Sequence, residues 1–192
     1  MGTEKIRCAW TGNNEFNNVY HDKEWGVPIH DDKKLFEFLI LDAFQAGLSW
    51  LTILKKRENF RKAFDGFNAE KIAKYNQTKI DELLNNEGII RNKLKISAAV
   101  TNAKAFLEVK KEFGSFDKYI WQFVDYNTIT NKWKTIKEVP ASRKESDSMS
   151  KDLKKRGFKF VGTTICYAFM QAAGLVNDHT TDCFRYSEID FD

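Results

Sequence analysis

The chain has 192 residues, 14% of them aromatic, with 16 Phe and only two Pro, so it is long enough for one or two domains and favours a compact, helix-rich fold. It contains no apolar run of the roughly 18 residues that a membrane span needs, and its first residues lack the apolar stretch of a secretory signal, so we expect no membrane association. Three Cys do not make a disulfide framework, which favours a cytoplasmic protein, and a net charge of +4 permits a nucleic-acid partner without requiring one.

The spacing of apolar residues predicts helices along almost the whole chain. Most of the predicted helices begin at an Asp, Asn, Ser or Thr that can cap them, and most end next to a Gly. In chain order they cover residues 31–46, 49–64, a short piece after Asn68, 78–87 with a capping box from Thr78 to Asp81, 94–113, 116–124, 147–156 and 163–173.

Residues 126–148 have the weakest pattern, and we interpret them as a surface excursion with a short extended piece. Residues 163–173 are apolar on nearly every side, as in a helix that lies in a core. The chain shows no repeat, low-complexity segment or linker. We therefore predict an all-α fold in which residues 1–192 form one unit with the two ends packed together.

Four residues near the two ends have a spacing that zinc would explain. Cys8 and His21 are separated by twelve residues, and His179 and Cys183 by three. Two thiolates and two imidazoles make a closed tetrahedral set, which is typical of a structural zinc site. The spacing alone is equally compatible with buried Cys and solvated His, because the long separation is not a zinc-finger pattern.

Residues 78–95 have the pattern of a short helix, a turn at Gly88 and a longer helix. Backbone N–H groups at the start of such a helix favour an anion, for which a nucleic-acid phosphate is the natural candidate. The cations that follow the turn are Arg91, Lys93 and Lys95. An ordinary helical hairpin with a solvated basic face would have the same pattern. Two further basic clusters, residues 55–57 and 154–156, are interpreted as solvated faces.

Asp42 stands inside an apolar run that is flanked in the sequence by four aromatic residues. A carboxylate on the buried side of a helix is unfavourable unless it is paired or used. Aromatic rings can stack on a purine while the carboxylate reads its edge, and a cationic base would add a cation–π attraction. The flanking aromatic residues are Trp10, Tyr20, Trp25 and Trp50. In the alternative interpretation, the Trp residues are core and Asp42 is exposed.

Four long stretches carry a resemblance to a known family. They are CAW at residues 8–10, YHDKEWGVP at 20–28, QAGLSWLTILKKRENFRKAF at 45–64 and LKKRGFKFVGTTICYAFMQAAGLVNDH at 153–179. Between residues 7 and 183 the chain resembles the 3-methyladenine DNA glycosylase I family, within the helix-hairpin-helix glycosylase superfamily. The resemblance implies a DNA-repair hydrolase that flips 3-methyladenine out of alkylated double-stranded DNA, releases it as the free base and leaves an abasic site.

The resemblance also implies roles for particular residues, together with a helix-hairpin-helix over residues 78–95. The expected zinc ligands, one ion per chain, are Cys8, His21, His179 and Cys183. The expected base-binding residues are Trp10, Tyr20, Trp25, Asp42 and Trp50, of which Asp42 and Tyr20 are the catalytic candidates. The expected DNA contacts are Gly47 and Leu48, in the gap that the flipped nucleotide leaves, and Gly88, Arg91 and Lys93 at the hairpin. We expect a monomer.

Two positions depart from the family pattern. Asp42 stands where the family commonly has Glu, so the carboxylate is one methylene shorter. Asn17 stands where the family often has Tyr, which removes one aromatic wall. No Lys matches a nucleophile, which predicts hydrolysis without strand cleavage. Two alternatives stay open: a non-catalytic, zinc-containing DNA-binding protein of the same fold, and a glycosylase with a different preference among alkylated bases.

Overall fold

The computed structural model describes residues 5–12 and 14–189, so the predicted unit 1–192 extends at both ends beyond the described residues. The helices are α1 (Glu15–Lys23), α2 (Asp32–Gln45), α3 (Trp50–Ala63), α4 (Ala69–Ile72), α5 (Gln77–Asn85), α6 (Lys93–Phe113), α7 (Phe116–Trp121), α8 (Lys144–Lys155) and α9 (Thr163–Ala172). Short 3-10 helices cover Ala9–Thr11, Asp65–Phe67, Gln122–Val124, Ile136–Glu138 and Phe184–Tyr186.

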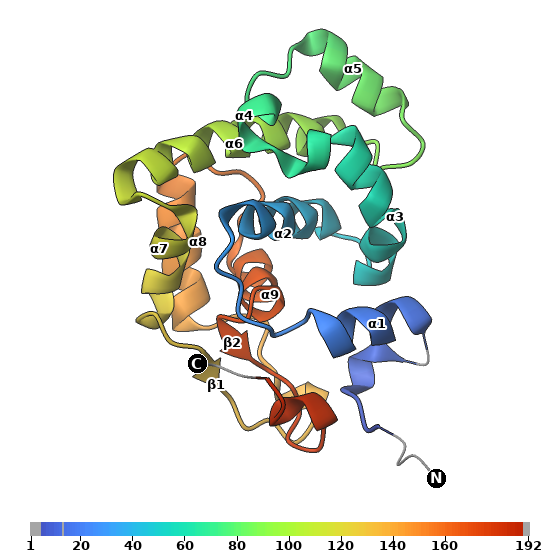
Figure 1. The fold of residues 1–192 in the computed structure, drawn as a ribbon, viewed down its shortest axis with the longest axis vertical. Coiled ribbons are helices and arrows are strands. Elements are labelled where there is room, and N and C mark those ends of the chain that lie inside the picture. The colour runs from blue at the N-terminus through green and yellow to red at the C-terminus, as the bar shows by residue number, and fades with distance from the viewer. Residues whose placement is uncertain (1–4, 13, 190–192) are drawn as a thin grey trace.

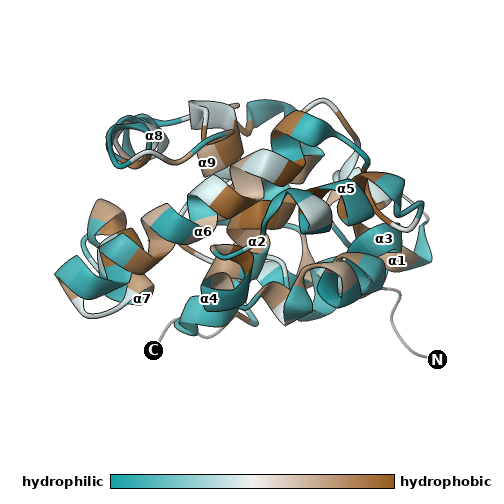
Figure 2. Ribbon diagram, turned by 90° about the horizontal axis from the view of Figure 1, so that it is seen from above, coloured by the Kyte–Doolittle hydropathy of each residue, from teal (hydrophilic) through white to brown (hydrophobic). Residues whose placement is uncertain are grey.

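Helix α2 lies at the centre of the molecule, with α6 and α9 on either side of it (Figure 1). Every residue from 35 to 44 is buried, because α2 packs against α3, α6, α7 and α9 on different sides. Viewed from above, hydrophobic residues gather on α2 and on the adjoining part of α6, while α4 and α1 turn hydrophilic residues outward (Figure 2). This arrangement removes the apolar run around Asp42 from water and so stabilises the fold.

Side-chain caps fix most of the helix starts, as the sequence indicates. Asp31 caps α2, Ser49 caps α3 and Ser115 caps α7. Helix α6 ends as predicted at Gly114, which has a φ of 84° that favours glycine. The capping box predicted at Thr78 is wrong, because Asn76 caps α5 by accepting from the Lys79 N–H.

Three further details differ from the sequence prediction. Helix α1 was not expected, and α8 begins at Lys144 rather than at 147 because its first turn closes on the Arg143 backbone. Two short parallel strands, β1 (Ile129–Thr130) and β2 (Val176–Asn177), pair in the register Ile129 to Val176. The pairing ties the excursion after α7 to the segment after α9.

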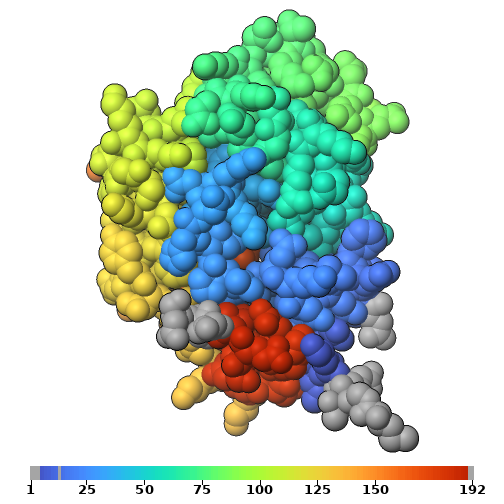
Figure 3. Space-filling view, in the orientation of Figure 1, coloured from blue at the N-terminus to red at the C-terminus, as the bar shows by residue number. Residues whose placement is uncertain are grey.

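The segments near the two termini lie side by side at one end of the molecule (Figure 3). The Phe184 N–H donates to the Ile6 carbonyl at 2.9 Å, and the Thr180 N–H contacts the Cys8 sulfur at 3.4 Å. Among the described residues, none of the helices is long and apolar enough to span a membrane.

Candidate active site

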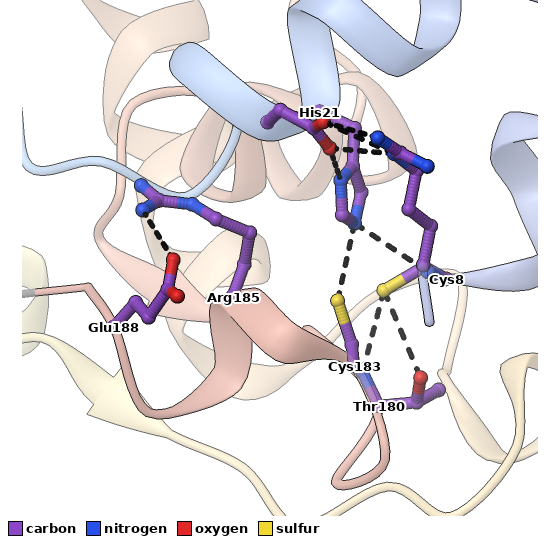
Figure 4. A network of polar contacts seen from close by, with 8 residues as sticks. Cys8, His21, Thr180, Cys183, Arg185 and Glu188 are labelled. Atoms are coloured by element: carbon purple, nitrogen blue, oxygen red, sulfur yellow. Dashed lines mark hydrogen bonds and ion pairs between the residues drawn. The ribbon is translucent and has the colours of Figure 1, made fainter. Parts of the chain in front are cut away.

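Three of the four predicted zinc ligands meet where the terminal segments pack. Ligand atoms of Cys8, His21 and Cys183 all lie within 4.8 Å of one another, and all three residues are buried. The His21 Nε2 atom lies 3.3 Å from the Cys183 sulfur, while its Nδ1 atom is 2.9 Å from the Asp22 carboxylate (Figure 4). Arg7 holds that carboxylate in turn, with Nη2 at 2.7 Å. Side chains of α1 and of both terminal segments therefore converge on one point.

His179 lies beside this group without belonging to the close cluster of three. Its ring centroid is 5.0 Å from that of His21, and its Nδ1 atom is 2.9 Å from Asn177 Oδ1. Its Nε2 atom is buried and has no hydrogen-bond partner in the described part of the chain. An orphaned imidazole nitrogen on a ring that packs against His21 is chemically suited to a metal ion, and a bonded Nδ1 is the usual support of a ligating histidine.

The two thiols of this cluster differ in charge state. The hydrogen bond with Cys183 and burial raise the pKa of Cys8, which favours its thiol. Hydrogen bonds from Cys8 and His21 lower the pKa of Cys183 to about 5, which favours its thiolate. Burial lowers the pKa of His179 to about 3, so its imidazole is neutral at pH 7. Metal binding needs deprotonated thiols and neutral imidazoles. The described residues therefore include a group that could hold a metal ion, and Cys8 would lose its proton when the ion binds.

A cavity of about 380 Å³ lies next to this cluster, within the range typical of small-molecule sites. All five predicted base-binding residues line it: Trp10, Tyr20, Trp25, Asp42 and Trp50. They come from the segment before α1, from α1 and the turn after it, from α2 and from the start of α3. The structure brings the set together, and its role in binding a base stays a prediction.

The aromatic rings of the cavity contact one another edge to face or at a tilt. The centroids of Trp10 and Trp25 are 5.0 Å apart, and those of Tyr20 and Trp50 are 5.3 Å apart. Trp25 also lies 4.5 Å from the His179 ring. The cavity and the Cys/His cluster therefore share a wall, so an ion in the cluster would fix the position of that wall.

Asp42 is 2% exposed, so the interpretation in which it faces solvent is wrong. Its Oδ2 atom is buried and has no hydrogen-bond partner within the described residues. Burial raises the pKa of Asp42 well above its usual range, and Arg57 opposes the shift only in part. Burial likewise raises the pKa of Tyr20, and the charge of Asp42 adds to the shift. The cavity therefore contains a buried carboxylate oxygen to which no described residue donates a hydrogen bond.

Part of the cavity wall was not predicted from the sequence. Ile136, Val139 and Pro140 line it, although they belong to the excursion that we interpreted as surface. The remaining lining residues are Gln45, Ala168, Gln171 and Ala172. Asn17 does not line the cavity and instead donates from Nδ2 to the Thr11 carbonyl at 3.0 Å. Because Asn stands at position 17, where the family often has Tyr, no side chain from this position lines the cavity.

An exposed turn between α2 and α3 contains Gly47 and Leu48, the two residues predicted to enter the gap that a flipped nucleotide leaves. Gly47 has a φ of 78°, and Leu48 is an exposed apolar side chain.

Lys95, one of the cations after the predicted turn at Gly88, points inward beneath the Gly47 turn. Its ammonium donates to the carbonyls of Phe44 and Ala46 at 2.7 and 2.6 Å. Lys95 is therefore not free for phosphate, and it ties the start of α6 to the end of α2.

The predicted hairpin corresponds to α5, α6 and the turn between them. The Gly88 N–H donates to the Asn86 side chain at 2.8 Å, so this particular N–H is already engaged. Arg91 is half exposed, with Nη1 3.7 Å from a carboxylate oxygen of Glu87, and Lys93 is exposed. The two cations can reach a polyanion, and their contact with DNA stays a prediction.

The basic clusters at 55–57 and 154–156 are not purely solvated faces. Arg57 is 6% exposed and pairs with Glu24 and Glu37 at 2.8 and 2.7 Å, because it lies against the Phe38 ring in the interior. Arg156 pairs with Glu112. Cys166 is buried, which agrees with the core helix predicted for residues 163–173.

Together these features define a class of protein: a helical protein with an aromatic cavity that contains one unsatisfied carboxylate, suited to a flat ring that donates hydrogen bonds. The family model for methyladenine glycosylase matches residues 10–186. The chain belongs to the methyladenine glycosylase family.

The relatives extend over nearly the whole chain. The sequence is 48% identical to DNA-3-methyladenine glycosylase 1 of Escherichia coli (strain K12), over 94% of this chain and 96% of that protein. A crystal structure of 3-methyladenine DNA glycosylase I superposes with a TM-score of 0.91 at 49% identity, over 93% of this chain and 98% of that one. A variant of such an enzyme in complex with 3-methyladenine superposes with a TM-score of 0.92 at 35% identity, over 96% and 99% of the two chains.

Proposed function

We propose that this chain is a monofunctional DNA glycosylase that flips 3-methyladenine out of alkylated double-stranded DNA, hydrolyses its N-glycosidic bond and leaves an abasic site. The observation that carries the proposal is the cavity in which Asp42 Oδ2 lies unpartnered among aromatic rings. A flipped base needs a pocket that stacks on its faces and reads its edge, and this cavity has groups of both kinds. The relatives named above are 3-methyladenine glycosylases.

The chemistry places modest demands on the protein. Methylation at N3 makes the adenine cationic and weakens its glycosidic bond, so the base leaves as a neutral molecule and needs no strong general acid. Asp42 accepts hydrogen bonds from the base and stabilises its positive charge, and Tyr20 supplies a polar contact. Trp10 and Trp50 stack on the ring, where a cationic base gains a cation–π attraction. Trp25 completes the wall.

DNA binding is assigned to two exposed turns. Leu48 enters the gap left by the flipped nucleotide, and the φ of Gly47 permits the sharp turn that presents it. The helix-hairpin-helix of α5 and α6, with Gly88 in its turn, contacts phosphates. Arg91 and Lys93 supply charge there, which is the sequence-independent part of DNA affinity.

A single structural zinc ion is assigned to Cys8, His21, His179 and Cys183. The support is the proximity of three ligands, the orphaned His179 Nε2 atom and the lowered pKa values of Cys183 and His179. Such an ion, when bound, joins the two terminal segments and takes no part in the reaction. We further propose that the chain acts as one unit, as a monomer, in the cytoplasm.

One assay tests the proposed function. Purified protein is incubated with methylated duplex DNA, and the released bases and the state of the strand are identified. Release of 3-methyladenine from an intact strand is the expected result. No release of any base would favour a non-catalytic DNA-binding protein, whereas release of 7-methylguanine at a comparable rate would favour a glycosylase of broader range. Strand cleavage would contradict the monofunctional mechanism.

A further inference from the structure

A buried carboxylate behind the cavity collects four hydrogen bonds. Asp178 is 2% exposed and lies just after β2. Its Oδ1 atom accepts from Asn131 at 2.6 Å and from the Trp133 indole at 2.7 Å. Its Oδ2 atom accepts from the Tyr167 hydroxyl at 2.7 Å and from Gln171 Nε2 at 2.8 Å. Both oxygens of Asp178 therefore hold their donors in fixed positions.

This contact determines which end of the Gln171 amide faces Asp178. The glutamine side chain has an NH₂ donor and a carbonyl acceptor on the same carbon, and an ionised carboxylate only accepts. The NH₂ group must face Asp178, so Oε1 points away from it. Gln171 lines the cavity, and its Oε1 atom makes no hydrogen bond within residues 5–12 and 14–189. Oε1 is therefore the end of this amide that is available to a ligand.

The cavity thus has two acceptors that no residue of the described chain satisfies, from neighbouring helices. Asp42 Oδ2 comes from α2 and Gln171 Oε1 from α9, and these helices pack against each other. Two acceptors that line the same cavity suit a group with two N–H hydrogens. The amino group at position 6 of an adenine is such a group, whereas guanine and hypoxanthine have an oxygen there that would face the acceptors without a hydrogen between them.

We propose that Gln171 is a second base-reading residue, whose side-chain carbonyl accepts a hydrogen bond from the 6-amino group of the flipped base while Asp42 accepts the other. Asp178 is the positioning residue that fixes the Gln171 amide. The inference rests on the proposed function, because it assumes that the cavity holds an alkylated adenine. Under this proposal, Gln171 and Asp42 distinguish 6-amino from 6-oxo purines, because an acceptor that faces the 6-oxygen loses its hydrogen bond.

The test compares two free bases that differ only at position 6. Affinities of the full chain for 3-methyladenine and for 3-methylhypoxanthine are measured by calorimetry for the parent protein, for Gln171→Met and for Gln122→Met. Met is similar in length to Gln and has no carbonyl. Gln122 is a matched control because it is half-buried, is not part of the cavity lining and donates from Nε2 to the Tyr119 carbonyl at 2.8 Å.

Gln171→Met should weaken 3-methyladenine binding by about tenfold, equivalent to about 1.4 kcal/mol, and leave 3-methylhypoxanthine binding nearly unchanged. Gln122→Met should change neither. Equal weakening of both bases by Gln171→Met would assign Gln171 a structural role only, and no change in either would show that it does not contact the base. Both results overturn the inference.

A second measurement uses the parent protein alone, in case Gln171→Met does not fold. An N6-methyl derivative of 3-methyladenine keeps one N–H and should bind about tenfold more weakly, because one acceptor loses its hydrogen bond. Equal affinity for the two bases would overturn the two-acceptor arrangement. The failure of the proposed function has a different signature, since the parent protein would then release no 3-methyladenine from methylated DNA.

Discussion

Replacing Asp42 with Asn should raise the stability of the protein at neutral pH while weakening its ligand binding. The change keeps the shape of the side chain and removes its charge. Asp42 is 2% exposed, and its Oδ2 atom lacks a hydrogen-bond partner among the described residues. Burial raises its pKa well above the usual range, so the folded protein disfavours the charge that the unfolded chain accepts readily.

The sign of the pH dependence follows from the two pKa values of Asp42. In the unfolded chain the carboxyl has a pKa of about 3.9. In the folded protein the pKa is higher, so between the two values the folded state binds more protons than the unfolded state. The free energy of unfolding therefore falls as the pH rises through this window. The loss is about 1.4 kcal/mol for each pH unit that separates the two pKa values, and an Asn at this position avoids it.

Urea unfolding of the parent protein and of Asp42→Asn at several pH values between 4 and 8 would measure this loss. All other titrating groups are shared, so the difference between the two free energies of unfolding isolates residue 42. We expect this difference to favour Asn increasingly as the pH rises from about 4. Parallel curves for the two proteins would refute the reasoning, because they would mean that the pKa of Asp42 does not change on folding.

Binding of the base should change in the opposite direction. Losing a hydrogen bond to a charged group typically costs about 1.5–3 kcal/mol, or roughly tenfold to over a hundredfold in affinity. Asp42→Asn should weaken free 3-methyladenine binding to that extent, and Asp42→Glu, which restores the residue common in the family, should keep activity. A more stable protein with weaker binding identifies a ligand-reading group. A purely structural Asp42 would leave the affinity of the folded protein unchanged.

Three further outcomes are expected. Purified protein should contain one zinc per chain, and Cys183→Ser should lose the metal and unfold at a lower urea concentration; metal analysis that finds no zinc in the parent protein would contradict this. Lys95→Met should lower the free energy of unfolding by about 2 to 5 kcal/mol, because two carbonyls at the end of α2 lose their donor; a parental urea midpoint would show that the contact contributes nothing. Arg91→Ala and Lys93→Ala should each weaken binding to any duplex and reduce its salt slope by about one unit; if both leave the salt dependence unchanged, the hairpin assignment is wrong.

The sequence predicts the helices whose apolar spacing and end signals agree. Helix α2 has an Asp at its start and a Gly after its end, and α6 has a regular apolar face that ends at Gly114. Helix α1 could not be predicted in this way, because its apolar residues Phe16 and Val19 face solvent while the polar His21 is buried. Its burial pattern depends on the Cys/His cluster, which forms only after distant segments meet.

The candidate site likewise contains residues that a local sequence signal identifies and residues that it does not. Asp42 could be found from the sequence because a carboxylate in an apolar run is unusual, and the Cys and His residues because they are few. Ile136, Val139 and Pro140 could not, since nothing in their local pattern reports that the chain folds back over the cavity. Gln171 has no local signal either, because its orientation depends on Asp178, seven residues further along the chain.

The cavity gives a physical reason why a cationic base would be preferred to normal adenine. Trp10 Nε1, Trp50 Nε1 and Asp42 Oδ2 are buried and unpartnered in the described chain, and all three residues line the cavity. When a neutral adenine occupies the cavity, the buried Asp42 carboxyl still favours its protonated form. A protonated Asp42 loses part of its capacity to accept hydrogen bonds. A base with a positive charge lowers the pKa of Asp42 and favours the carboxylate. Binding of the cationic base should therefore release a proton from Asp42, whereas a neutral base would accept that proton with no net release. The parent protein should therefore release more protons per bound base than Asp42→Asn does. Calorimetric titration of 3-methyladenine in buffers of different ionisation enthalpy at pH 6, where the free base is partly protonated, measures this proton count. Identical counts for the parent protein and Asp42→Asn would show that selection for charge does not pass through residue 42.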